Sequence, residues 1–283
     1  MQRFEVLGSD PQYLRDTQYR DPANLHARVA LHAKYAKDTE PWYPWLAARI
    51  VWPEGGDVVE VGCGSGLLWA NIGPLLPRLR LTLTDLSEGM ASAATERAGA
   101  LTDMEVVAAH VCDAQDLPFE DASFDIAVAN HMLYHVPDPG LAAAELARIL
   151  RPDGVLLAAT NGPAHLAALS DLQIQVYGTS PRELVGRRFG KLSGGDVLGG
   201  SFDSVQWHDH PGRLECDDRE DVYAYIASTS IAQEAPPEKL EELRAAIHAR
   251  FAADGGVLRT TIESGCFVAR GPRRPDACDG GDG

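Results

Sequence analysis

His131 and His135, four residues apart, are the side chains in this sequence best suited to acid–base chemistry. They follow the apolar run Phe124–Asn130, which predicts a buried strand. An imidazole is the usual base for a hydroxyl nucleophile near neutral pH. The same spacing resembles half of a metal site, but no glutamate completes an H-E-x-x-H pattern, so no metal is expected. Both histidines are candidate bases, with cofactor contact for His131 and capping or packing for His135 as the alternatives.

A glycine-rich turn, VVEVGCGSG at Val58–Gly66, joins a predicted strand to a helix-like segment. Its three glycines, Gly62, Gly64 and Gly66, allow backbone N–H groups to approach a ligand at a helix N-terminus. The spacing G-x-G-x-G differs from the G-x-G-x-x-G of dinucleotide-binding turns, which counts against a nicotinamide-dependent oxidoreductase. Asp85 lies nineteen residues beyond Gly66, at the end of a second predicted strand. A carboxylate at that place can accept hydrogen bonds from a ribose diol.

The order of these motifs, followed by DAQDLPFEDASFD from Asp113, resembles the small-molecule type of class I S-adenosylmethionine-dependent methyltransferases. The resemblance runs from about residue 57 to residue 160. It implies S-adenosylmethionine as cofactor and methyl transfer to an O, N or C nucleophile of a small molecule. It also implies where each matching residue lies. Expected around the methionine part are Glu60, Gly62, Cys63, Gly64, Gly66, Asn130 and His131; at the ribose, Asp85; and at the adenine, Leu86, Met90, Asp113 and Ala114.

Several of these assignments have a simpler structural alternative. Leu86 and Met90 are equally consistent with packing in a helix core. Aromatic side chains help to hold a sulfonium cation, and the candidates Tyr19, Trp69 and Tyr134 each have packing as an alternative. If the acceptor is an amine, a carboxylate such as Glu263 is a candidate to serve it.

The N-terminal residues 1–52 are expected to form a helical lid, as in many methyltransferases of this class. Apolar spacing predicts a helix over Asn24–Lys37 and a second apolar segment over Trp42–Val51. The alternative is an amphipathic helix that covers one edge of the sheet. The lid candidates are Tyr19, Asn24, Arg28 and Tyr35, of which Tyr19 and Arg28 are assigned to the cofactor; the substrate candidates are Tyr35, Tyr134, Asn161 and His165.

Alternating strands and helices predict an α/β fold with a doubly wound, Rossmann-like sheet of seven strands. In such sheets ligands bind outside the carboxyl ends of the strands, where all the motif residues fall. The expected core is 53–212 and 257–270, and its last two strands, Phe202–His208 and Arg259–Arg270, are expected to pair as a hairpin. Between them, 213–256 is predicted as a helical insertion over the site. The glycine-rich, basic stretch 178–200 is placed near the surface, and the tail 271–283 is predicted to be disordered.

Composition narrows the class of partner. The formal charge of −16 disfavours a nucleic-acid substrate, and the strand end reads NHML rather than an NPPY-type signature. No membrane span or signal-peptide pattern is evident, and five cysteines without a C-x-x-C indicate reduced thiols in the cytoplasm. We therefore expect a small-molecule acceptor, in secondary metabolism. The alternative is a protein of the same fold that binds the cofactor without transferring methyl, as a cyclase or a structural partner.

Overall fold

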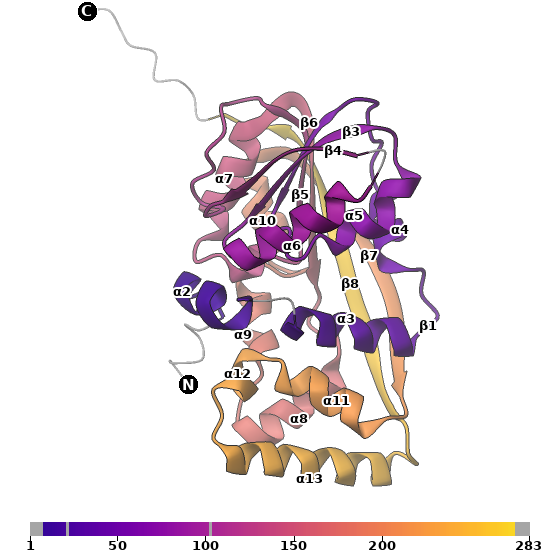
Figure 1. The fold of residues 1–283 in the computed structure, drawn as a ribbon. Helices are drawn as coiled ribbons and strands as arrows, with labels where there is room; N and C mark the ends of the chain where they lie inside the picture. Colours follow the sequence, from indigo (N-terminus) through magenta and orange to yellow (C-terminus); the bar gives the residue numbers. More distant parts are fainter. Residues whose placement is uncertain (1–7, 21–22, 102–103, 275–283) are drawn as a thin grey trace, which may run out of the picture.

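The computed structural model describes residues 8–20, 23–101 and 104–274. Within these residues eight strands form one sheet, in the order β1-β7-β8-β6-β5-β2-β3-β4 (Figure 1). Five neighbouring strands are parallel, and β8 and β7 are antiparallel additions beyond β6. The strands are β1 Ala36–Lys37, β2 Asp57–Val61, β3 Leu79–Asp85, β4 Met104–Val111, β5 Phe124–Asn130, β6 Leu150–Asn161, β7 Phe202–Cys216 and β8 Leu258–Pro272.

Helices cover both faces of the sheet, as expected for a doubly wound fold. Along β2, Val58 packs with one helical layer and Val59 with the other, because successive strand residues point to opposite faces. One layer holds α4 Trp42–Ala47, α5 Leu67–Ile72 and α6 Glu88–Gly99, with η2 Gly73–Leu75 following α5; the other holds α7 Pro139–Ile149 and α10 Gly194–Gly199. The predicted doubly wound fold is therefore confirmed.

The predicted strand number was wrong by one. The expected helix Asn24–Lys37 ends at Tyr35, and Ala36 and Lys37 become β1, paired antiparallel with Leu214 and Arg213. This pairing is available because β7 runs to Cys216, well beyond the predicted end at His208, and leaves an open edge there.

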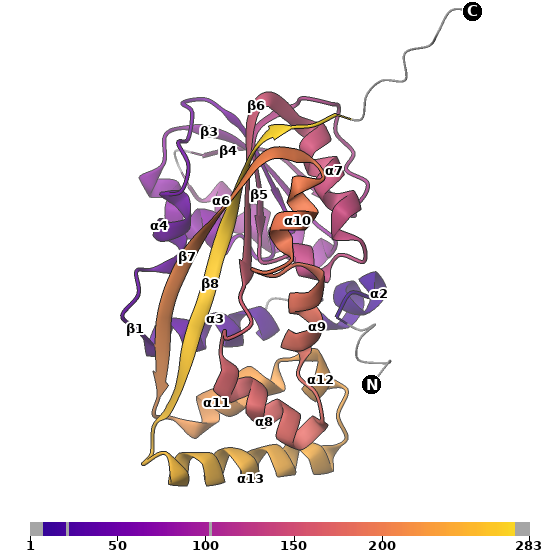
Figure 2. The same ribbon diagram turned by 180° about the vertical axis from the view of Figure 1, so that it is seen from behind.

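Beyond the two layers on the faces of the sheet, a further group of helices packs at the lower end of the long β7–β8 hairpin (Figures 1 and 2). Its register runs from the pair Phe202 and Pro272 to the pair Cys216 and Leu258. These helices share a hydrophobic cluster that includes Leu31 and Phe251. We call this layer the cap; it contains α3 Ala23–Tyr35, α8 Ala167–Tyr177, α11 Arg219–Ala227, α12 Ser230–Gln233 and α13 Pro237–Ala253. None of the described helices has the length and apolar character needed to cross a membrane.

Two further segments differ from the sequence prediction. The expected helix after β6 begins only at Ala167, because Leu166 takes a left-handed conformation with φ 52°. The stretch 178–200 forms α9 Pro181–Arg188 and α10, and its Phe189 and Leu198 are fully buried rather than close to the surface. Of the predicted tail, 275–283 lies outside the described residues; β8 extends into its first two.

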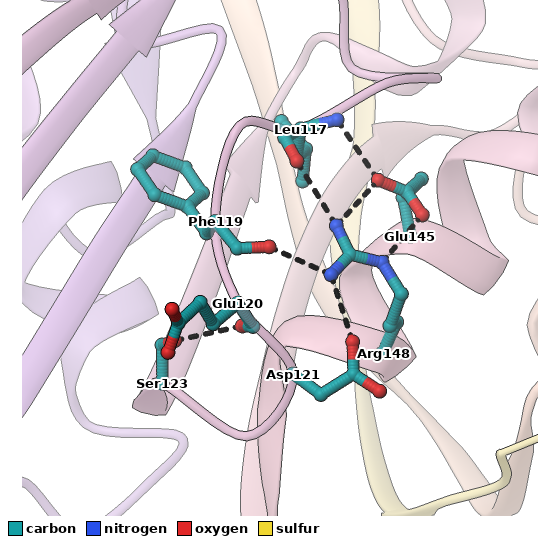
Figure 3. Close-up of polar contacts among 7 residues, drawn as sticks. All are labelled: Leu117, Phe119, Glu120, Asp121, Ser123, Glu145 and Arg148. Atoms are coloured by element: carbon teal, nitrogen blue, oxygen red, sulfur yellow. Dashed lines mark hydrogen bonds and ion pairs between the residues drawn. The ribbon is translucent and has the colours of Figure 1, made fainter.

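A network around Arg148 of α7 fixes the loop that follows β4 (Figure 3). The guanidinium donates to the carbonyls of Phe119 at 2.7 Å and Leu117 at 2.9 Å. It also pairs with Asp121 and with Glu145, and Glu145 Oε2 accepts the N–H of Leu117 at 2.8 Å. The loop is thereby attached to α7 at both ends of LPFED, which holds the preceding Asp113 region in place.

Candidate functional site

A cavity of about 710 Å³ opens at the carboxyl ends of the parallel strands, between the sheet and the cap. It brings together residues from the loops after all five parallel strands. It also receives residues of the N-terminal segment, including η1 Leu14–Gln18, and of α11. The predicted residues on its wall are Tyr19, Arg28, Glu60, Gly62, Cys63, Gly64, Asp85, Leu86, Met90, Asp113, Ala114, Asn130, His131, Tyr134, His135, Asn161 and His165.

The glycine turn approaches the cavity in the way its spacing predicts. Gly62 and Gly64 have φ values of 67° and 53°, a conformation that L side chains rarely adopt. A Cβ on Gly62 would lie 2.7 Å from Met132 Cβ. Gly66 does not line the cavity: a Cβ there would lie 2.9 Å from Ala94 Cα, so this glycine allows α5 and α6 to pack closely. The structure gives Gly66 a packing role, and its predicted contact with the methionine part stays a prediction.

Asp85 is held at the cavity by backbone donors. Gly64 N–H donates to its Oδ2 and Ser87 N–H to its Oδ1, both at 2.9 Å. Burial raises the pKa of Asp85, while these hydrogen bonds oppose the rise. The backbone of Leu86 is a third donor to this carboxylate, which has about four acceptor sites, so at least one remains for a ribose hydroxyl.

The adenine candidates lie along the next loops. Asp113 accepts the backbone N–H of Gln115 at 2.9 Å, which fixes its carboxylate at the cavity wall. Met90 is only 1% exposed and Ala114 6%, so both also serve as core. Met90 therefore packs in the core, as the alternative expected, and also lines the cavity.

Glu60 is a carboxylate almost sealed beneath the glycine turn, with 2% exposure. Its Oε2 accepts from Trp69 Nε1 at 2.6 Å. Burial raises the pKa of Glu60 well above its ordinary value, and the Trp69 hydrogen bond opposes this. Trp69 itself is fully buried and absent from the cavity wall, so packing and orientation of Glu60 replace its predicted role in holding a cation.

A chain of hydrogen bonds joins the N-terminal segment to η3 Leu133–His135. Arg28 Nη1 lies 3.1 Å from the Tyr19 hydroxyl, which lies 2.9 Å from His135 Nε2. The other ring nitrogen, Nδ1, is 2.9 Å from the carbonyl oxygen of Gly8. A carbonyl can only accept, so we assign the proton to Nδ1; Nε2 then accepts from Tyr19. Burial lowers the pKa of His135 to about 4, so the ring is neutral at pH 7.

His131 follows β5 in a left-handed conformation with φ 58°. Its ring lies 4.9 Å from that of Trp42, whose Nε1 donates to Asn130 Oδ1 at 3.3 Å. Burial, with neighbouring histidines, lowers the pKa of His131 to about 3. His131 is therefore a neutral wall residue between β5 and the N-terminal segment. Across the described residues, no group of three or more His, Cys, Asp or Glu is arranged to hold a metal ion.

Comparison with known proteins places this geometry in a family. Residues 59–158 match the model of the family described as "Methyltransferase domain". Residues 59–158 therefore carry the pattern of a methyltransferase domain. The chain is 30% identical over 183 residues, 64% of its length, to 27-O-demethylrifamycin SV methyltransferase of Amycolatopsis mediterranei. It spans 61% of that relative.

Solved structures agree with the fold of this methyltransferase domain. Phosphoethanolamine N-methyltransferase 2 of Haemonchus contortus superposes with a TM-score of 0.55 at 16% identity, covering 95% of this chain and 60% of that one. The [4+2]-cyclase SpnF superposes with a TM-score of 0.52 at 16% identity, covering 89% of this chain and 96% of that one. At these identities the likeness concerns the fold alone.

Only some of the predicted substrate residues line the cavity. Tyr134, Asn161 and His165 line the cavity, but Tyr35 does not; its hydroxyl donates to Asp221 at 2.7 Å and ties α3 to α11. Tyr35 is thus a structural contact of the cap rather than a substrate residue. Glu263 is also off the cavity wall.

Glu263 and Asn24 each have contacts that explain why they do not line the cavity. Glu263 is bound by Lys191 and by the backbone N–H of Ala164, which directs its carboxylate elsewhere. Asn24 too is off the wall, and its amide donates to the carbonyl of Gln18.

Sequence reasoning missed two residues near the methyltransferase site. Trp42 lies on the cavity wall and holds Asn130, and the only signal for it was its place at the start of a predicted apolar segment. Gln18 is 2% exposed and donates to the carbonyl of Ser228 at 3.1 Å, 210 residues away. A contact between residues so far apart in the sequence cannot be predicted from the pattern of neighbouring residues.

Proposed function

We propose that this chain uses S-adenosylmethionine to methylate a hydroxyl oxygen of a small molecule. The observation that carries the proposal is the Tyr19–His135 hydrogen bond at the wall of the same cavity that contains Asp85, Asp113 and Glu60. A neutral, oriented base therefore shares one chamber with a predicted nucleoside site. The likeness to 27-O-demethylrifamycin SV methyltransferase supports an oxygen acceptor and a role in secondary metabolism.

The residues present fit this cofactor. Asp85 keeps an acceptor site for a ribose hydroxyl, and Asp113 offers a carboxylate to an adenine amino group. Glu60 lies where a carboxylate would face the cationic methionine part. When bound, the cofactor supplies an electrophilic methyl group on a positively charged sulfur. The apolar side chains of Leu25, Val29 and Trp42 on the cavity wall reduce its contact with water.

The hydrogen-bond chain provides a path for the acceptor's proton. Tyr19 oxygen has one lone pair directed to Arg28 Nη1 and one left for an acceptor hydroxyl. As the acceptor oxygen forms its bond to the methyl carbon, its proton passes to Tyr19, whose own proton moves to His135 Nε2. The imidazolium keeps its Nδ1–H on the carbonyl of Gly8 and later releases the added proton to solvent. The electron pair of the broken carbon–sulfur bond stays on sulfur.

Transfer of labelled methyl from S-adenosylmethionine to a panel of small phenols and alcohols tests this proposal. We expect His135→Gln and Tyr19→Phe to lower kcat about 100-fold or more, as loss of acid–base assistance does. S-adenosylhomocysteine affinity should change less than about threefold, and the control His110→Gln, on β4 and off the cavity wall, should leave kcat unchanged. Unchanged turnover in both site variants would remove the proton path.

The same experiment addresses the alternative of a protein that binds the cofactor without transferring methyl. SpnF has the fold and is a cyclase, so the fold alone does not choose between them. Tight binding of S-adenosylmethionine without any labelled product across the panel would favour that alternative.

The four described cysteines are free thiols, which supports the predicted cytoplasmic location.

A further inference from the structure

A smaller hollow of about 160 Å³ adjoins the main cavity, and Tyr19, Arg28 and His135 line both. We call this hollow the annexe; its further wall residues include Gln18, Gln173 and Thr229. No aspartate or glutamate is present among the described residues of its wall. Two arginines, Arg28 and Arg188, lie on this wall, which is a departure from the general composition in a chain of formal charge −16.

Arg28 is a cation held only by neutral groups. Nη1 donates to the Tyr19 hydroxyl at 3.1 Å, Nε to Ser228 Oγ at 3.2 Å and Nη2 to the carbonyl of Ser228 at 2.6 Å. No carboxylate of the described chain forms an ion pair with it. Arg28 is half-buried, and a partly desolvated charge without an opposite charge has a cost that anion binding would offset.

The donors that remain on Arg28 have a defined arrangement. A guanidinium has five N–H groups, and three are used here, one on each nitrogen. One N–H is therefore left on each terminal nitrogen. Two such donors in one plane match the two oxygens of a carboxylate.

Gln18 adds an unused acceptor at the same place. Its Nε2 donates to the carbonyl of Ser228, which fixes the orientation of the amide, and its buried Oε1 has no hydrogen-bond partner among the residues that the structure describes. A buried acceptor left unpaired is unfavourable. A ligand with a hydroxyl or N–H beside its carboxylate would satisfy both Gln18 and Arg28.

The position of Arg28 along α3 separates it from the glycine turn. One turn earlier, Leu25 Cδ2 would lie 3.3 Å from a Cβ on Gly64, and His26 Nε2 lies 3.4 Å from Ser65 Oγ. Arg28 instead contacts Tyr19 and Ser228, on the side of the annexe. The anion it favours is therefore more consistent with the acceptor than with the cofactor.

We propose that the annexe binds a carboxylate of the methyl acceptor through Arg28, with Gln18 accepting from a neighbouring hydroxyl. The proposal rests on the function proposed above and names its substrate class: small aromatic or aliphatic hydroxy acids. This replaces the predicted contact of Arg28 with the cofactor.

Calorimetry on protein saturated with S-adenosylhomocysteine tests this, with salicylate, its neutral counterpart salicylamide, benzoate and inorganic phosphate as probes. We expect salicylate to bind at least about tenfold more tightly than salicylamide and more tightly than benzoate, which lacks the hydroxyl. Arg28→Met should abolish the preference for salicylate over salicylamide, and Arg28→Lys, which keeps the charge but not the two-donor edge, should reduce it. The control Arg15→Met removes a half-exposed arginine of the main cavity that pairs with Asp16, and it should preserve the preference.

Each contrary result has its own meaning. If wild-type protein does not bind S-adenosylhomocysteine, the proposed function fails; if it does but salicylate does not bind, or binds equally to Arg28→Met, only the annexe proposal fails. Tighter binding of phosphate than of salicylate would overturn the assignment to a carboxylate. If Arg28→Met weakens S-adenosylhomocysteine about tenfold but leaves 5′-methylthioadenosine unchanged, Arg28 binds the cofactor's carboxylate and the proposal is overturned.

Discussion

The carboxylate of Glu60 is buried, and this burial raises its pKa. Because the folded-state pKa lies above the unfolded value, this group contributes stability at low pH, and that contribution is lost as pH rises through the folded pKa. Glu60→Gln keeps an oxygen for Trp69 and removes the charge. We expect ligand-free Glu60→Gln to melt at a higher temperature than wild type at pH 8, with a smaller difference at pH 5.

The same variant should bind the cofactor less well, because a cationic methionine part would lose its carboxylate. We expect S-adenosylhomocysteine affinity in calorimetry to fall about tenfold, or about 1.4 kcal/mol. Glu105→Gln, an exposed change on β4, serves as control. Equal affinity in wild type and Glu60→Gln would show that Glu60 only supports Trp69.

At the residue scale, more of the predicted cofactor residues than of the predicted lid and cation-binding residues lie on the cavity wall. Asp85 ends β3 and Asp113 follows β4, and parallel strands bring their carboxyl ends to one edge, so local pattern decides their position. Tyr35 and Trp69 were misplaced because a tyrosine or tryptophan on a helix carries no local sign of whether it faces a cavity or the core. Gln18 escaped prediction because its partner, Ser228, belongs to a distant insertion.

At the scale of elements, the loop between β4 and β5 depends on one side chain of α7. Arg148→Met removes the bonds to the carbonyls of Leu117 and Phe119 and the pairing with Glu145 (Figure 3). We expect the free energy of unfolding in urea to fall by about 2–3 kcal/mol. The cofactor should bind more weakly as well, because Asp113 precedes the loosened segment.

The control for this prediction is an arginine with an exposed partner. Arg244 pairs with Glu220, whose side chain is 64% exposed, and exposed pairs contribute about 0–1 kcal/mol. Arg244→Met should therefore remain close to wild type. If Arg148→Met were equally stable, the loop would be held by its apolar contacts rather than by α7.

Strand and helix positions in the core could be predicted because hydrophobic periodicity there is local. The ends of β7 and β8 could not: residues beyond His208 do not alternate clearly, and they are extended because each pairs with a residue of the other strand along its whole length. β1 exists for the same reason, since Ala36 and Lys37 pair with that extension. Pairing between distant segments, rather than propensity, decides these bounds.

At the scale of the whole molecule, the cavity lies where three hydrophobic clusters meet: two on the faces of the sheet and one in the cap. The family match covers 59–158 only, whereas Tyr19, Arg28 and Tyr225 come from outside it. In the function proposed above, the matched residues would build the cofactor side and the N-terminal segment and the cap the acceptor side. Acceptor specificity would accordingly reside in the parts of the chain with the weakest sequence pattern.

This arrangement buries neutral histidines, which makes stability depend on pH. The pKa values of His131 and His135 are lowered to about 3 and about 4, below their value of 6.5 in an unfolded chain. Between pH 6.5 and 4 the unfolded chain therefore binds more protons, so the contribution of these rings is present above pH 6.5 and lost on acidification. At pH 5 the loss is about 2 kcal/mol for each ring.

We expect the double variant His131→Asn, His135→Gln to lose clearly less unfolding free energy than wild type between pH 7.5 and 5. Asparagine tolerates the left-handed conformation at position 131, and glutamine retains hydrogen-bonding groups at 135. The raised pKa values of Glu60 and Asp85 act with the opposite sign, but both groups are present in both proteins and cancel in the difference. Urea titrations of ligand-free protein at the two pH values give this difference directly. Parallel pH profiles for the two proteins would mean that the rings are reached by water and titrate near 6.5, and the sheltered cavity that methyl transfer requires would then be absent.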